Sequence, residues 1–187
     1  MTSALQLWMP IVLSAVLVFV ASSLIHMVFK WHNGDYRSFA NEDQVRDALR
    51  AAGASPGVYV TPHVTDMKEM GRPEVLKKFV DGPIAVVTLR PNGPPRMGPM
   101  LGQWFGFSAV VAALVAYVAS KTLPVGAGFF SVCREVGVMT LLAYAGGSVI
   151  DGIWWGKPWG SVAKETLDAI IYGTLSALAF AWLWPAA

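Results

Sequence analysis

The sequence predicts a membrane all-α protein, a four-transmembrane-helix bundle with a small cytoplasmic α/β insert between the first and second helices. Of the 187 residues, 55% are apolar and only 14% are charged, whereas soluble proteins carry about 25% charged residues. Four apolar runs are long enough, at about 1.5 Å per residue, to cross a hydrocarbon core of about 30 Å. The polar residues are concentrated in one segment, residues 30–100.

Composition also excludes several classes of protein. A single cysteine, Cys133, cannot form an intramolecular disulfide, so a disulfide-stapled fold is excluded. The formal net charge is only +2 and the basic residues form no dense patch, which argues against nucleic acid as a partner. The lipid bilayer is the partner that the composition predicts.

The first predicted helix covers residues 7–29, which contain no charged residue. A signal peptide would need a positive region before its apolar core, but no Lys or Arg precedes Lys30. We therefore expect a retained helix, with Pro10 tolerated near its first turn.

The later apolar runs predict three more helices and a cytoplasmic loop before the last one. The helices are residues 102–120, 129–150 and 167–184, and the loop is residues 151–166. Lys121 follows the second helix, Arg134 and Glu135 lie near the start of the third, and Asp168 falls in the first turn of the fourth.

The distribution of basic residues predicts the orientation. Ten of the fourteen Lys and Arg residues lie in residues 30–100, and Lys157 and Lys164 lie in the loop on the same side. Only Lys121 and Arg134 fall on the opposite side. Because basic residues favour the cytoplasmic side, we expect a multi-pass protein of the cell inner membrane with residues 30–100 in the cytoplasm and both termini in the periplasm.

Tryptophan positions support four crossings, because indole rings prefer the membrane interface. All eight lie at predicted helix ends. Those expected on the outer side are Trp8, Trp182 and Trp184, and those on the cytoplasmic side are Trp31, Trp104, Trp154, Trp155 and Trp159.

Within the insert, turn residues predict the order helix, strand, helix, strand. The expected elements are residues 41–50, 57–61, 74–80 and 84–89. Asn41 is expected to cap the first helix, and Gly53 and Gly82 to end the two helices. The long connection between the strands would allow a parallel pair.

Small residues four positions apart predict faces on which helices approach closely. They are Gly102 and Gly106 on the second helix, and Ala169, Gly173, Ala177 and Ala181 on the fourth. Two interpretations stay open: these faces pack the protein's own helices, or they dock another membrane protein or a second copy.

Ionisable groups within predicted spans are costly and are therefore candidate site residues. The candidates are His26, Arg134 and Glu135. His26 is either an interfacial histidine bonded to a carbonyl or serine, or a member of a proton relay. We expect Arg134 to reach the outer interface and Glu135 to pair with Lys121.

Asp151 and Asp168 are expected at the cytoplasmic ends of their helices. There they would cap helices and form ion pairs with Lys157 or Lys164.

His63, Met67 and Met70 offer the soft ligands that suit Cu(I). Because methionine is also a common packing residue, and an open Cu(I) site does not suit the cytoplasmic side, we interpret them as packing residues and predict neither metal nor cofactor. A haem pair from His26 and His32 is disfavoured, since residues six apart do not share a helix face. No phosphate-loop, dinucleotide, zinc-protease or hydrolase motif occurs.

Several segments resemble a group of uncharacterised bacterial inner-membrane proteins. They are the residues 8–15, 22–27, 66–70, 171–173 and 182–185. The resemblance implies a bacterial inner-membrane location and no particular activity, cofactor or catalytic residue.

The absence of a catalytic constellation predicts a non-enzymatic protein: an accessory, assembly or scaffold subunit that acts through its helix faces and its insert, bound to itself or to another membrane protein. The alternative is transport of a small solute or ion through an oligomer interface, supported by His26, Glu135 and Tyr144. A membrane-bound enzyme would require a wet cavity that gathers His26, His32 and His63.

Overall fold

The computed structural model describes residues 4–186, and within them the chain is mostly helical. Met1 and Ala187, whose sidedness the sequence predicts, lie outside the described residues. The chain divides into two compact units. One combines the residues up to Tyr36 with those from Arg96 onward, and the other is Arg37–Pro95.

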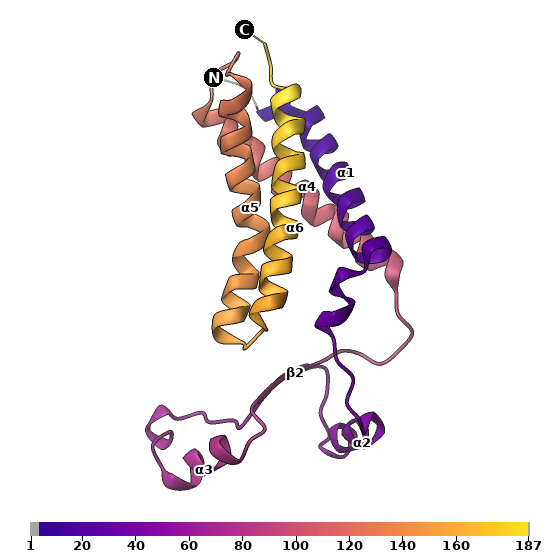
Figure 1. Ribbon diagram of the computed structural model, residues 1–187, viewed down its shortest axis with the longest axis vertical. Coiled ribbons are helices and arrows are strands. Elements are labelled where there is room, and N and C mark those ends of the chain that lie inside the picture. Colours follow the sequence, from indigo (N-terminus) through magenta and orange to yellow (C-terminus); the bar gives the residue numbers. More distant parts are fainter. Residues whose placement is uncertain (1–3, 187) are drawn as a thin grey trace. The chain divides into compact units, whose positions relative to one another are not determined.

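The first unit contains four long helices (Figure 1). They are α1 (Trp8–Ser23), α4 (Met97–Thr122), α5 (Phe129–Trp154) and α6 (Trp159–Trp182). A short 3₁₀ turn, η1 (Ala4–Leu7), precedes α1, and a π-helical turn, η2 (Leu24–Phe29), continues it. Helix α6 packs against α5 and α1, while α4 packs against α1 and α5, so each long helix contacts two others.

Three helical segments in residues 4–186 are long and apolar enough to cross a membrane: Trp8–Phe29, α4 and α5. A fourth crossing by α6 is not confirmed. The first half of α6 carries Lys164, Glu165 and Asp168, which shorten its uninterrupted apolar stretch.

The predicted loop at residues 151–166 is shorter in the structure. Helix α5 continues to Trp154, and α6 begins at Trp159, directly after Pro158. Proline has no N–H to donate and is tolerated at a helix start, where the first N–H groups have no helical acceptor. Asp168 therefore lies about two and a half turns inside α6, not in a first turn as the sequence predicted.

The core of the helical unit is formed by apolar side chains from several helices. Its largest cluster consists of Leu7, Val111, Val115, Ala116, Ala119, Val132, Val136, Phe180 and Trp184. Helices α5 and α6 approach closely at Gly173, where an added Cβ would lie 3.0 Å from the carbonyl oxygen of Gly137. This close approach needs the small residues that the sequence showed on α6.

The second unit has helix α2 (Glu42–Ala51), strand β1 (Gly57–Thr61), the turn η4 (Met67–Glu69), helix α3 (Pro73–Asp81) and strand β2 (Ala85–Leu89). The predicted order of helices and strands is confirmed. Gly53 and Gly82 have positive φ angles of 64° and 62° and end the two helices.

The strands pair antiparallel, so the expectation of a parallel pair was wrong. Thr61 faces Ala85 and Gly57 faces Leu89, which means that the connection leaves and re-enters the sheet at the same end. A parallel pair would need the chain to cross from one end of the sheet to the other. Here η4 and α3 form an excursion from a hairpin instead of a crossover.

The predicted insert, residues 30–100, is longer than this unit at both ends. Residues Trp31–Asp35 form a 3₁₀ segment, η3, that belongs to the helical unit, because Lys164 of α6 binds both the backbone of Trp31 and the side chain of Asp35. At the other end, Met97 already begins α4.

Candidate functional site

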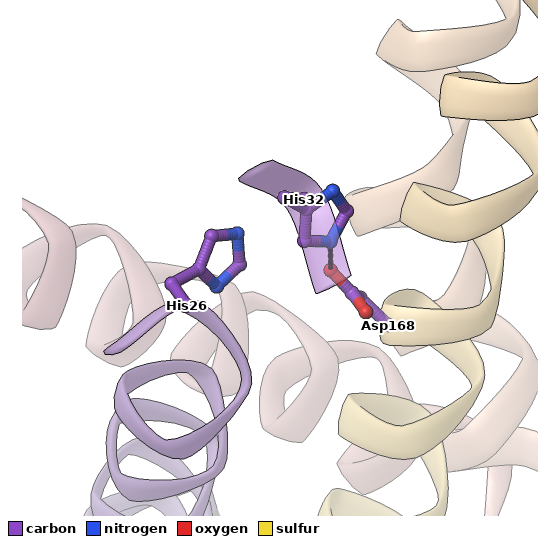
Figure 2. Close-up of side chains that lie close together, drawn as sticks. All are labelled: His26, His32 and Asp168. Atoms are coloured by element: carbon purple, nitrogen blue, oxygen red, sulfur yellow. Dashed lines mark hydrogen bonds and ion pairs between the residues drawn. The ribbon is translucent and has the colours of Figure 1, made fainter. Parts of the chain in front are cut away.

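Three polar side chains from three elements converge in the helical unit (Figure 2). His26 comes from η2, His32 from η3 and Asp168 from α6. One candidate ligand atom from each of them lies within 4.8 Å of the others. We call these three residues the His–Asp cluster.

Lys30 makes this convergence possible. It is the non-glycine residue with a positive φ (55°) among residues 4–186, and its N–H donates to the carbonyl of Ile25 at 3.0 Å. A left-handed residue ends a helix and redirects the chain. The chain therefore changes direction at Lys30, and the ring of His32 stacks on that of His26 with centroids 4.7 Å apart. The two histidines meet although they do not share a helix face, because they lie on different elements, η2 and η3.

Both ring nitrogens of His32 face carboxylate oxygens. Nδ1 lies 2.8 Å from Oδ2 of Asp35, and Nε2 lies 2.8 Å from Oδ2 of Asp168. Each contact requires one proton between nitrogen and oxygen. Either His32 is an imidazolium, or it is neutral and one carboxyl is protonated. In both cases the three groups together carry one negative charge.

Lys164 balances that charge. Its Nζ donates to Oδ1 of Asp35 at 2.7 Å and to the carbonyl of Trp31 at 2.9 Å. The hydrogen bond from Lys164, and next to it the one from His32, outweighs burial and lowers the pKa of Asp35 below its usual value. The network of His32, Asp35, Asp168 and Lys164 is thus electrically neutral, as a largely buried network needs to be.

His26 is oriented by its own helical turn. Its Nδ1 lies 2.9 Å from the carbonyl oxygen of Ser22 and must be the protonated nitrogen, because a carbonyl only accepts. In the neutral ring, Nε2 is then the nitrogen with a lone pair. The hydroxyl of Ser22 accepts a hydrogen bond from the indole N–H of Trp104 at 2.7 Å, which ties this turn to α4.

A cavity of about 520 Å³ adjoins the cluster and lies entirely within the helical unit. Its polar lining includes Ser22, His26, Glu165, Asp168 and the two tyrosines 144 and 172, and its apolar lining includes Trp104 and Phe107. Mostly apolar cavities with a few convergent polar groups are typical of small-ligand sites.

Glu165 forms the polar edge of this cavity. It accepts hydrogen bonds from Lys157 at 2.6 Å and from Ser148. Burial alone would raise the pKa of Glu165, but these two donors outweigh it and the pKa is lowered. Glu165 is therefore a fixed negative charge at neutral pH.

Two buried side-chain atoms in residues 4–186 have no hydrogen-bond partner: Oδ1 of Asp168 and Nε1 of Trp31. Unpartnered buried polar atoms are costly and often mark function. Asp168 is only 4% exposed, so its second carboxylate oxygen is shielded from water.

The structure corrects two ion-pair expectations. Asp168 is hydrogen-bonded to His32 and not to Lys157 or Lys164. Glu135 accepts from the hydroxyl of Thr122, whereas Lys121 lies over the ring of Tyr117. The expected pair of Asp151 with Lys157 is present at 3.9 Å.

The remaining candidate residues lie away from the cluster. Arg134 and Cys133 border a shallow groove between α5 and α6, and Glu135 does not line the cavity. His63 and Met67 are exposed in the second unit, and Met70 is half-buried there. Gly173 and the buried Ala169 and Ala177 pack within the helical unit, Ala181 is half-buried, and Gly102 and Gly106 face open space.

Sequence reasoning found His26 but missed the roles of Asp35 and Lys164. One signal was present: Lys164, Glu165 and Asp168 occur close together at the start of an otherwise apolar run. Charges within or beside apolar segments usually have partners, and the complementary residues His32 and Asp35 follow the first apolar run, residues 7–29.

Comparison with known protein families, with curated proteins and with solved structures found no match.

Proposed function

We propose that the chain is a four-crossing protein of the bacterial inner membrane with a non-enzymatic role, an accessory or assembly subunit that binds another membrane protein through its second unit and its helix faces. Helix α6 supplies the fourth crossing in this proposal. Its apolar part follows Asp168, and its charged first half is neutralised by His32, Lys157 and the pair of Lys164 with Asp35.

The proposed topology follows the distribution of basic residues. The second unit holds most of the Lys and Arg residues, which supports a cytoplasmic position for it and periplasmic termini. An even number of crossings keeps both termini on one side.

The observation that carries the proposed role is that no residue of Arg37–Pro95 is buried. Apolar side chains of this unit lie at the surface, among them Phe39, Val58, Leu76, Val80 and Ile84. A two-stranded sheet without a packed face is marginally stable in water. The unit therefore gains a core only when another surface covers these side chains.

A protein partner suits this unit better than a lipid surface does. Acidic and basic side chains are nearly balanced across Arg37–Pro95, whereas segments that bind anionic lipids are strongly basic. The sheet has only two strands, so each strand has an outer edge without a neighbouring strand in the described chain. Such edges accept an extended segment of a partner by adding a strand.

Helix α4 offers a second contact surface of the kind expected for membrane partners. At Gly98, Gly102 and Gly106 an added Cβ would meet nothing within 4 Å, so no other element of the helical unit covers this face. Small residues at this spacing allow another helix to approach closely within a bilayer.

The proposal is tested by photo-crosslinking of the full chain in native membranes. A photoreactive residue is placed at Val58 or Val86 on the strands, and at Asp47 on exposed α2 as the matched control. We expect a discrete protein adduct, identified by mass, from the strand positions and not from Asp47. The charge substitution Val60→Asp should abolish that adduct. Lipid adducts alone, together with a monomer in lipid nanodiscs, would overturn the proposal.

Transport of a small solute or ion is the second candidate, favoured by the 520 Å³ cavity that His26 and Tyr144 line. In proteoliposomes, His26→Ala should abolish flux if the cavity forms part of the path. Glu135→Gln serves as the control because Glu135 does not line the cavity. Equal flux in wild type and His26→Ala would remove this candidate.

A further inference from the structure

We propose that the His–Asp cluster is a binding site for a divalent first-row transition metal such as Zn²⁺, with Nε2 of His26, Nε2 of His32 and the carboxylate of Asp168 as ligands. This inference does not depend on the accessory role proposed above. It rests on the identity of the donor atoms, the hydrogen bonds that orient them and the cavity beside them.

The donor set is the first argument. Imidazole nitrogen and carboxylate oxygen are the ligands that Zn²⁺ and its neighbours take in proteins, and two histidines with one carboxylate leave room for a further ligand. One side-chain ligand atom from each of the three residues lies within 4.8 Å of those from the other two. Tetrahedral metal–ligand bonds of about 2.0–2.1 Å put neighbouring ligand atoms about 3.3 Å apart. His26 must therefore approach by about 1 Å, while the 2.8 Å contact of His32 with Asp168 must open slightly. His26 is exposed at the end of its helix and can make that movement.

The hydrogen bonds behind the ligands are the second argument. A histidine that binds metal through one nitrogen usually donates its other N–H to a carbonyl or a carboxylate. Nδ1 of His26 is bonded to the carbonyl of Ser22, and Nδ1 of His32 to Asp35. Lys164 holds Asp35 in turn. Both imidazoles therefore have the orienting partners typical of metal ligands.

Asp168 supplies the third argument, independent of the histidines. Its Oδ2 lies 2.8 Å from Nε2 of His32, and its Oδ1 is buried with no hydrogen-bond partner. A metal ion between Nε2 of His32 and Asp168 would take the position of the proton that now joins them. The metal ion would also interact with Oδ1 of Asp168, which is buried and has no hydrogen-bond partner.

The cavity indicates the kind of metal site. His26 and Asp168 both line it, so a metal bound by them would face a space large enough for water or a small ligand. Structural zinc sites are closed by four protein ligands, whereas three protein ligands and an accessible position characterise sites that bind exogenous molecules. With three protein ligands beside an open cavity, the His–Asp cluster resembles the sites that bind exogenous molecules.

The test is equilibrium binding of Zn²⁺ and Co²⁺ to the purified, tag-free full chain in detergent, by calorimetry and by the visible absorption of bound Co²⁺. We expect one metal ion per chain. His26→Ala should weaken binding by at least about 10- to 100-fold, the loss typical of removing even an outer partner of a metal ligand. His63→Ala is the matched control, since His63 is exposed in the other unit, and it should bind like the wild type.

His26 is the decisive position because it bonds only to its own helical turn and stacks on His32, so its loss leaves the buried network in place. His26→Gln provides a second variant of similar size. Asp35→Asn tests the orienting role, with weaker binding but an unchanged stoichiometry. Absence of saturable binding, or equal affinities of the wild type and both His26 variants, would overturn the proposal.

Discussion

The imidazole rings of His26 and His32, six residues apart in the sequence, stack with centroids 4.7 Å apart and ring planes 6° apart. This contact places a helix-end histidine directly beside a buried network that spans more than 130 positions of sequence, from His32 to Asp168. The network joins the segment that follows the apolar helix Trp8–Phe29 to the first half of α6. The whole site therefore depends on one local feature, the change of chain direction at the left-handed residue Lys30.

Replacing Lys30 should reveal the free-energy cost of its left-handed backbone conformation. An L-residue in the left-handed region costs about 1 kcal/mol relative to glycine. We expect Lys30→Gly to raise the free energy of unfolding by up to about 1 kcal/mol and Lys30→Val, which is β-branched, to lower it by about 1–2 kcal/mol. Thermal unfolding in detergent measures both. An increase in stability with valine would contradict the left-handed conformation at Lys30.

Asp35 should make the stability of the helical unit depend on acidity. Its pKa is lowered by Lys164 and then by His32, so the folded chain binds this proton less readily than the unfolded chain does. The stabilisation is therefore present above the unfolded pKa, about 3.9, and is lost as the pH falls through the lowered folded pKa. Melting temperatures from pH 7 down to pH 3 should show this loss in the wild type.

Asp35→Asn removes the titrating group and should flatten that acid-induced decline. Asp43→Asn is the control: Asp43 is 91% exposed and lies 3.4 Å from Arg46, so it contributes little. An unchanged acid response in Asp35→Asn would show that other carboxylates account for it.

Sequence patterns predicted the features that depend on neighbouring residues. Turn residues such as Gly53 and Gly82 located the ends of α2 and α3, and uninterrupted apolar runs located α1, α4 and α5. The direction of strand pairing was not predictable in this way, because the connection of residues 62–84 is long enough for either arrangement.

The site was harder to predict because two of its contacts join residues that are far apart in sequence. His32 meets Asp168, and Asp35 meets Lys164. Charge counting placed Lys164 and the 30–100 segment on the same side, but it could not pair individual residues. Asp168 was expected to cap a helix and was therefore not treated as a site residue. That expectation was wrong, because α6 begins earlier, at Trp159.

Removing Asp168 should strongly destabilise the helical unit. The side chains of His32 and Asp168 are only 11% and 6% exposed, so Asp168→Ala leaves Nε2 of His32 buried without its acceptor. Breaking one side of a buried pair costs about 3–5 kcal/mol. Denaturant unfolding in mixed micelles should show a loss of this size. Asp151→Ala, whose partner Lys157 lies 3.9 Å away at a more exposed position, should cost at most about 1 kcal/mol.

A double-mutant cycle separates the pair from its surroundings. If the hydrogen bond to His32 is the main role of Asp168, the double variant His32→Ala with Asp168→Ala should lose much less stability than the sum of the two single losses. Additive losses would show that the two side chains stabilise the fold independently.

A glycine-to-alanine substitution should have opposite effects on stability at Gly173, where α5 and α6 approach closely, and at Gly106 on α4, where space is open. In Gly173→Ala the new Cβ would lie 3.0 Å from the backbone carbonyl of Gly137, and a backbone atom cannot move aside without shifting its helix. Overpacking of this kind costs about 1–3 kcal/mol. In Gly106→Ala the new Cβ meets nothing within 4 Å, so the higher helix propensity of alanine should leave stability unchanged or raise it by up to about 1 kcal/mol. Unfolding of both variants in detergent measures the difference, and a Gly173→Ala variant as stable as Gly106→Ala would contradict the observed α5–α6 contact.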